Sequence, residues 1–184
     1  EYAGKKPEYD ATGRYMPYWT RTGSGGLQAE AIVFSATAGA NDWYDVPKKT
    51  GKVFFTEPYN YPIDGKPVLM ASLVAPVLVG GKFQGTASAD FTLTQLGRIL
   101  ADLKVIQGAQ MALVSNGGLY ASNPNAELVN KKAKDIPEAG LDAIKKGLAY
   151  EYRDKADLVH LIQPVVVHPD TAPWAVRLSF PRSV

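Results

Sequence analysis

The chain contains no cysteine and only two histidines, His160 and His168. The lack of cysteine excludes disulfide frameworks, thiolate nucleophiles and cysteine-ligated zinc sites. Neither histidine has an acidic residue at metal-ligand spacing, and no serine stands in a nucleophile-elbow motif. We therefore expect two ordinary surface or edge histidines, with no metal site and no hydrolase centre.

A long apolar run and an excess of one charge are also missing. No stretch approaches the roughly 18 consecutive apolar residues of a membrane span, and no basic-then-apolar signal segment opens the sequence. The net charge is only +2, which gives no electrostatic footprint for nucleic acid. Because the chain starts at Glu1 without methionine, we expect a fragment whose targeting and membrane anchoring lie in flanking segments.

Glycine is frequent, but its arrangement is not that of a nucleotide-binding loop. The pairs at 25–26, 80–81 and 117–118 each stand in a predicted loop or hairpin turn. None gives the glycine pattern of a phosphate loop or a dinucleotide fold. Together with the missing nucleophiles and metal ligands, this predicts no cofactor and no enzymatic activity.

The composition and the apolar periodicity predict an α+β globular protein. The chain has 184 residues, of which 46% are apolar and 21% charged, which is room for one medium or two small domains. Residues 42–51 mix aromatic and charged residues with Pro47 and Gly51, which predicts a short helix followed by a surface loop, a candidate lid. Longer helices are predicted over 92–103 and 137–147. The segment 28–34 fits either a strand or a short helix. Strands are predicted over 14–21, 53–56, 67–79, 82–90, 109–115, 119–122, 148–153, 158–167 and 174–180.

The second half of the sequence repeats the plan of the first in outline. Pro76–Val79 with its Gly-Gly turn resembles Pro164–Val167 with its His-Pro-Asp turn, and the offset is 164 − 76 = 88 residues. We therefore predict two tandem modules, residues 1–95 and 96–184, each an antiparallel sheet with flanking helices.

Aromatic residues concentrate in the first module and mark the candidate site. Tyrosine and tryptophan combine an apolar face with a hydrogen-bonding edge, which suits a pocket for a small polar molecule or a cation. The alternative is that they fill a small core. Asp90 is either a carboxylate of the pocket or a cap for the helix that begins near Thr92. The aromatic set is Tyr15, Tyr18, Trp19, Trp43, Tyr44, Tyr59 and Tyr61.

Several of these residues stand in motifs that resemble the double Cache (dCache) sensor family. These are extracytoplasmic sensor regions of bacterial methyl-accepting chemotaxis receptors, and also of some histidine kinases. The resemblance is most specific between Trp43 and Asp90 and implies two PAS-like modules without the long N-terminal helix that normally opens the family fold. The motifs are Gly13-Arg-Tyr-Met-Pro-Tyr-Trp19, Asp42-Trp-Tyr44, Thr56-Glu-Pro-Tyr-Asn-Tyr61, Asp64-Gly-Lys-Pro-Val68, Ala75-Pro-Val77 and Gly81-Lys-Phe-Gln-Gly85.

The resemblance implies that the membrane-distal module, residues 1–95, binds a ligand and that the proximal module relays the signal. Amino-acid-binding members carry an arginine two positions before a Trp-Tyr pair and an aspartate two positions after a tyrosine, where this sequence has Asn41 and Tyr61. Both charged partners of an amino-acid zwitterion are thus replaced. The implied ligand-binding residues are Tyr15, Tyr18, Arg21, Trp43, Tyr44, Tyr59, Tyr61 and Asp90.

Two ligand classes follow from these residues. A small carboxylate such as acetate or propionate, which we slightly favour, would be held by tyrosine hydroxyls, backbone N–H groups and Arg21 or Lys48. An amine, a quaternary ammonium compound or a purine would instead use the aromatic faces with Asp90 as counter-charge. A module that binds a protein or a glycan is the alternative to a sensor. The resemblance further implies a homodimer and a periplasmic or extracellular location on an inner-membrane receptor.

Overall fold

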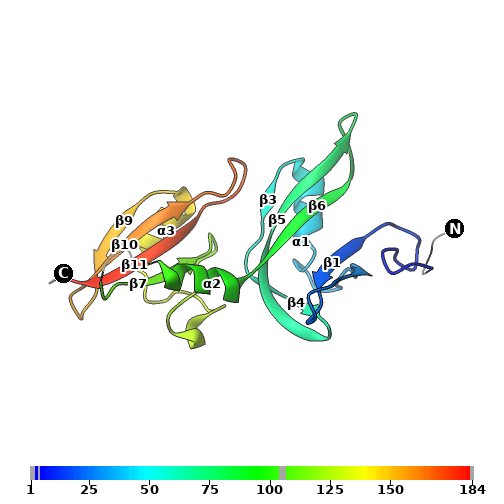
Figure 1. Ribbon diagram of the computed structural model, residues 1–184. Coiled ribbons are helices and arrows are strands. Elements are labelled where there is room, and N and C mark those ends of the chain that lie inside the picture. Colours follow the sequence, from blue (N-terminus) through cyan, green and yellow to red (C-terminus); the bar gives the residue numbers. More distant parts are fainter. Residues whose placement is uncertain (1–2, 4, 104–106, 183–184) are drawn as a thin grey trace. The chain divides into compact units, whose positions relative to one another are not determined.

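The computed structural model describes residues 3, 5–103 and 107–182, and these form two compact units (Figure 1). The first unit comprises Glu1–Asn41 with Ile63–Gly65, and the second comprises Asp42–Pro62 with Lys66–Val184. In the described part of the chain no long helix precedes the first strand, and none of the described helices has the length and apolarity that a membrane crossing requires.

The first unit is built on one hairpin. β1 (Pro17–Arg21) pairs antiparallel with β2 (Leu27–Ala31). Residues 28–34, which fitted either a strand or a short helix, therefore form a strand as far as Ala31. A turn precedes the hairpin at Asp10, whose carboxylate accepts hydrogen bonds from the backbone N–H groups of Thr12 and Arg14, both at 2.9 Å.

The second unit contains two antiparallel sheets, and the first of them is centred on one long strand. β5 (Lys66–Val79) pairs with β3 (Phe54–Phe55), β4 (Tyr59–Ile63) and β6 (Lys82–Thr92). A tight turn joins β4 to β5, where Asp64 and Gly65 both have positive φ angles, 50° and 71°, as a two-residue hairpin turn requires. β4 was not predicted, because Pro62 stands within it and proline argues against a strand.

A short helix packs on this sheet. α1 (Asp42–Thr50) fills nearly the whole range in which a short helix and then a loop were predicted, so the predicted loop is helical up to Thr50. The helix carries acidic residues in its first turn and lysines in its last turn, which complements the helix dipole. Tyr44 places its ring against Phe83 of β6, with a centroid distance of 5.4 Å. The helix is thereby fixed to the outer strand of the sheet by an edge-to-face aromatic contact.

The second sheet has five strands in the order β8-β7-β11-β10-β9. α3 (Glu138–Lys146) packs on it and ends at Gly147, which has a φ of 67° in the left-handed conformation that glycine favours. The strands are β7 (Gln110–Val114), β8 (Tyr120–Ser122), β9 (Tyr150–Arg153), β10 (Leu158–Val165) and β11 (Trp174–Pro181), with a 3-10 turn η1 (Ala126–Leu128). The core beneath α3 contains Ala112, Val114, Tyr120, Ala133, Ile136, Ile144, Ile162 and Ala175.

α2 (Leu93–Asp102) leads from the first sheet to the second (Figure 1). Residues of both sheets and of α2 form one core. Phe55 of β3 contacts Trp174 of β11 with ring centroids 4.6 Å apart. Other members of this core are Ala71, Leu93, Leu113 and Ala121. The α+β class with antiparallel sheets is thus confirmed. The predicted division after residue 95 falls inside α2 and stays a prediction.

Candidate ligand-binding site

A chain of three hydrogen-bonded side chains crosses the first sheet from β4 to β6. The Tyr59 hydroxyl lies 2.7 Å from Ser72 Oγ, which donates to Asp90 Oδ1 at 2.6 Å. Ser72 and Asp90 are directly opposite each other in the β5–β6 register, so their side chains share one face of the sheet. Ala71 and Leu73 lie in or against the core between the sheets, and alternation therefore places Ser72 on the opposite face.

The direction of this chain follows from the number of protons available. The single proton of Ser72 is used in the bond to Asp90, so the Tyr59 hydroxyl must be the donor toward Ser72. Burial raises the pKa of Tyr59 to about 12, and the negative charge of Asp90 acts in the same direction. Tyr59 is therefore a neutral donor at ordinary pH. Among the described residues, Asp90 Oδ2 receives no hydrogen bond.

Two neighbouring groups extend the face around this chain. Tyr61 is half-buried and stands two residues after Tyr59 on β4, so the two side chains project on the same side of the strand. Ser72 is held from the backbone side by Thr56, whose Oγ1 accepts from the Ser72 N–H at 2.9 Å. The structure thus brings together Tyr59, Tyr61 and Asp90 from the predicted site.

The two predicted aromatics of α1 form a separate contact near the other end of β6. Trp43 and Tyr44 lie edge to face at 5.7 Å, and Tyr44 contacts Phe83. Lys48 Nζ stands 5.4 Å from the centre of the Tyr44 ring, a cation–π distance. Phe83 and Asp90 are seven residues apart on one strand, roughly 23 Å at 3.3 Å per residue, so this aromatic group and the Asp90 chain are distinct parts of one sheet.

Three predicted site residues belong to the first compact unit. Tyr15 is 62% exposed and packs on Tyr9 at 5.2 Å. Tyr18 is half-buried on β1, and Arg21 is exposed at the end of the same strand. They lie on the unit built from β1 and β2, while the chain of Tyr59, Ser72 and Asp90 is complete within the second unit.

Sequence analysis missed Ser72, the central member of the chain. Ser72 is only 1% exposed, and a buried hydroxyl needs a hydrogen-bond partner. The signal was present, since Ser72 is the single polar residue in the apolar run Val68–Val74. Asp90 was left open between pocket and cap. The N-cap residue of α2 is Thr92, and Asp90 bonds Ser72 instead.

The second sheet carries a denser polar cluster that sequence analysis did not detect. Arg177 Nη1 lies 2.6 Å from Asp135 Oδ2, and the Tyr120 hydroxyl donates to both oxygens of Asp135 at 2.8 and 2.9 Å. The Arg177 guanidinium also stands over the Tyr120 ring at 5.2 Å. Burial raises the pKa of Asp135, but hydrogen bonds from Arg177 and Tyr120 and the Arg177 charge outweigh it and leave that pKa below its ordinary value.

The expectation of two surface or edge histidines is wrong for one of them. His160 is 6% exposed and stands on β10, an inner strand between β9 and β11. Its Nδ1 lies 2.7 Å from Ser179 Oγ, its Nε2 lies 3.2 Å from Asp154, and its ring stacks on Tyr152. A buried histidine with both ring nitrogens partnered is a structural residue. In residues 3, 5–103 and 107–182 no group of metal-ligating side chains is found.

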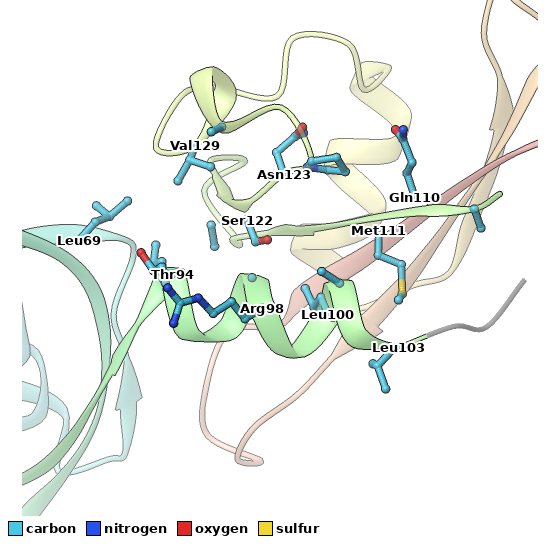
Figure 2. Close-up of a pocket in the computed structure, with 17 residues that line it drawn as sticks. Leu69, Thr94, Arg98, Leu100, Leu103, Gln110, Met111, Ser122, Asn123 and Val129 are labelled. Carbon is cyan, nitrogen blue, oxygen red and sulfur yellow. The ribbon is translucent and has the colours of Figure 1, made fainter. Parts of the chain in front are cut away.

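A cavity of about 530 Å³ lies between α2 and the strands β7 and β8 (Figure 2). Arg98 and Thr94 of α2 line it, and Ser122 and Asn123 stand on the side of β8. None of the predicted site residues lines this cavity. It therefore does not belong to the face that carries Asp90.

Comparison with known proteins gives this fold a family. The family model for the first PDC sensor domain of methyl-accepting chemotaxis protein-like proteins matches residues 2–98. The chain belongs to this family. It is similar to the methyl-accepting chemotaxis protein TlpQ of Pseudomonas aeruginosa, with 30% identity over 93% of this chain and 26% of the relative. The chain thus spans about a quarter of the length of that relative.

Two solved structures extend the similarity to nearly the whole chain. The extracellular domain of the putative histidine kinase mmHK1S-Z3 has 26% identity and a TM-score of 0.79, over 99% of this chain and 66% of the other. A structure titled methyl-accepting chemotaxis protein X has 28% identity and a TM-score of 0.78, over 94% and 65%. The chain is an extracytoplasmic, ligand-binding sensor domain of the chemoreceptor type, as its motifs predicted.

Proposed function

We propose that this sensor domain binds a small cation, an amine or a quaternary ammonium compound, on the face formed by Tyr59, Ser72 and Asp90. The observation that carries the proposal is the second oxygen of Asp90, which takes no hydrogen bond from the described residues while its first oxygen is held by a neutral hydroxyl. A carboxylate fixed in this way attracts a positive charge, because in the described part of the chain no cationic side chain is paired with it.

The aromatic neighbours fit the same ligand. Tyr59 and Tyr61 project from β4 on the side of Asp90, and ring faces attract ammonium groups. Tyr59 is fixed by Ser72 at 2.7 Å, so its ring is ordered before a ligand arrives. Preorganisation of this kind raises affinity, because the side chain loses little freedom on binding.

The carboxylate class that the sequence slightly favoured has less support from this geometry. A bound carboxylate needs a cationic or N–H partner, and Asp90 would repel it. Of the two candidate cations, Arg21 belongs to the first unit, and Lys48 stands over the Tyr44 ring. A carboxylate ligand therefore remains the second candidate, with Lys48 as its donor.

The wider role follows from the relatives. We infer a non-enzymatic sensor region of a transmembrane chemoreceptor in which residues 1–95 bind the ligand and residues 96–184 relay the signal. The similarity to a histidine kinase domain makes a kinase the alternative output. Pairing of two sensor domains as a homodimer belongs to the same proposal.

A thermal-shift panel tests the ligand class, because a ligand that binds only the folded state raises the melting temperature. The panel contains choline, ethylamine and putrescine as cations, acetate and propionate as carboxylates, and adenine as the purine that the aromatic faces could also hold. We expect an increase with the first group that is lost in Asp90→Asn. An increase with acetate alone, unaffected by Asp90→Asn, would transfer the site to the carboxylate model. No increase with any compound would favour the module that binds a protein or a glycan.

A further inference from the structure

We propose that Glu57 couples the ligand-binding face of the first sheet to the β7–β8 turn of the second sheet. The inference rests on the proposed function, in that the coupled face is the one assigned to the ligand. Glu57 was not among the predicted site residues, and no metal or ligand is needed to explain its position. Its importance comes from where its two oxygens are bound.

Both carboxylate oxygens of Glu57 are held by one turn of the other sheet. Ser115 Oγ donates to Glu57 Oε2 at 2.5 Å, and the Gly117 backbone N–H donates to Glu57 Oε1 at 2.8 Å. Ser115 is fully buried. The contact spans about sixty residues of sequence, so it is a tertiary link between the two sheets and not a local turn.

The turn is shaped to receive this carboxylate. A Cβ atom added at Gly117 would lie 2.7 Å from Glu57 Oε2 and 2.9 Å from Glu57 Cδ, distances that no side chain tolerates without moving the carboxylate. The same Ser115 Oγ also accepts from the Leu119 N–H at 3.0 Å. The hydroxyl therefore joins the closure of the turn to the position of Glu57.

The segment that carries Glu57 is also the segment that builds the candidate site. Thr56 precedes Glu57 and accepts from the Ser72 N–H, and Tyr59 follows it by two residues and bonds Ser72 Oγ. Phe55 and Glu57 alternate with Thr56, so that the first two contact the second sheet while Thr56 contacts β5. A shift of Tyr59 or Ser72 must therefore move the backbone that positions the Glu57 carboxylate.

Coupling between two sites is reciprocal, which makes it measurable without a ligand. The readout is hydrogen exchange of the Gly117 and Leu119 amides, which become exposed when the turn opens locally. The variants are Tyr59→Phe, Glu57→Gln and the double variant. The Val176 amide on the central strand β11 reports global unfolding, and Lys52→Ala, which removes a different contact between the sheets at 3.9 Å to Asp170, is the matched control.

We expect Tyr59→Phe to accelerate Gly117 exchange by about threefold or more, the lower range for groups in one network. The same substitution should have no effect in the Glu57→Gln background, and Lys52→Ala should leave the turn unchanged. Gly117→Ala, read at the Leu119 amide, should likewise abolish the Tyr59→Phe effect, because it displaces the carboxylate. Gly117 has no positive φ angle, so alanine fits its backbone.

Equal acceleration by Tyr59→Phe with and without Glu57, or no acceleration at all, would overturn the coupling. Saturating choline gives a second arm, in which the wild-type Gly117 amide should exchange more slowly. Choline that binds without changing this exchange also overturns the coupling. If choline does not bind, the proposed ligand class fails, and the exchange of Tyr59→Phe still decides whether Glu57 links the two sheets.

Discussion

Each of the two sheets in the second unit binds one prominent carboxylate, and the two carboxylates are partnered in opposite ways. Asp135 lies in the turn before α3 and is bound by the guanidinium of Arg177 on β11 and by the hydroxyl of Tyr120 on β8. Asp90 in the first sheet accepts a hydrogen bond from the neutral Ser72 hydroxyl, and within residues 3, 5–103 and 107–182 no cationic side chain is paired with it. The charge of Asp135 is therefore neutralised by Arg177, whereas the charge of Asp90 can be neutralised by a ligand.

The difference has a physical reason in the cost of burying charge. A buried guanidinium without a counter-charge is strongly destabilising, and Arg177 is only 8% exposed, so Asp135 has a structural task. Asp90 is half-buried on an outer strand, and none of the cations that the structure describes is paired with it. Asp90 can therefore bind a ligand without leaving a buried charge uncompensated, whereas Asp135 cannot.

The largest expected effect on stability comes from breaking the ion pair between Asp135 and Arg177. Asp135→Ala leaves Arg177 buried and unpaired and should lower the free energy of unfolding by about 3 kcal/mol, measured by urea denaturation. The double variant Asp135→Ala with Arg177→Met should recover most of the loss, because an apolar pair replaces the ionic one. If Asp135→Ala unfolds at the same urea concentration as the wild type, the pair is not structural.

Removing the charge of Asp90 should weaken ligand binding and leave folding unchanged. Asp90→Asn keeps the shape but loses the charge, so choline affinity measured by calorimetry should fall by about 1.5–3 kcal/mol, the range for a hydrogen bond or contact to a charged group. Asp170→Asn, in the loop before β11, is the matched control and should bind choline as the wild type does. Unchanged affinity in Asp90→Asn would show that the charge of Asp90 does not bind choline, and the contrast with Asp135 would fail.

A smaller effect is expected from the hydroxyl that links Tyr59 to Asp90. Ser72→Ala leaves the Tyr59 hydroxyl without its acceptor and Asp90 without its donor, and the free energy of unfolding should fall by about 1 kcal/mol. Ser88→Ala is the control, because Ser88 is an exposed serine on the neighbouring strand β6. If Ser88→Ala lowers the free energy of unfolding as much as Ser72→Ala does, the hydrogen bonds of Ser72 to Tyr59 and Asp90 contribute nothing specific to stability.

The smallest expected effect is a difference in acid sensitivity. The folded pKa of Asp135 is lowered, so its contribution to stability is complete above the unfolded value of about 4 and is lost as pH falls through the folded value. Urea midpoints measured between pH 5 and pH 2 should therefore fall less steeply in Asp135→Asn than in the wild type. Identical slopes would contradict the assigned direction.

Sequence periodicity predicted most of the elements of this fold. The helices α2 and α3 and all the strands of the second sheet lie where apolar spacing placed them, because each element buries one face against a core. β4 escaped detection because Asn60 and Pro62 interrupt it. Its pairing is decided by the turn at Asp64 and Gly65 and by the tertiary partner β5, which local propensity cannot weigh.

The candidate site was predicted less completely than the fold. Tyr59, Tyr61 and Asp90 were identified from their residue types and motif, yet Ser72 was not, although it joins two of them. The partners of Asp135 and Glu57 lie 42 and about 60 residues away in the chain. Such pairs depend on how distant segments of the chain pack together, and no pattern within a single segment encodes that packing.

The segment at Thr56 and Glu57 also constrains how this chain can change over evolutionary time. Successive residues there contact different sheets, with Thr56 on β5 and Glu57 on the β7–β8 turn. Insertion or deletion of one residue would exchange the two directions, whereas a change of two residues would restore them. Length variation among descendants of this gene should therefore be tolerated in the loop before β1 and excluded between β3 and β4.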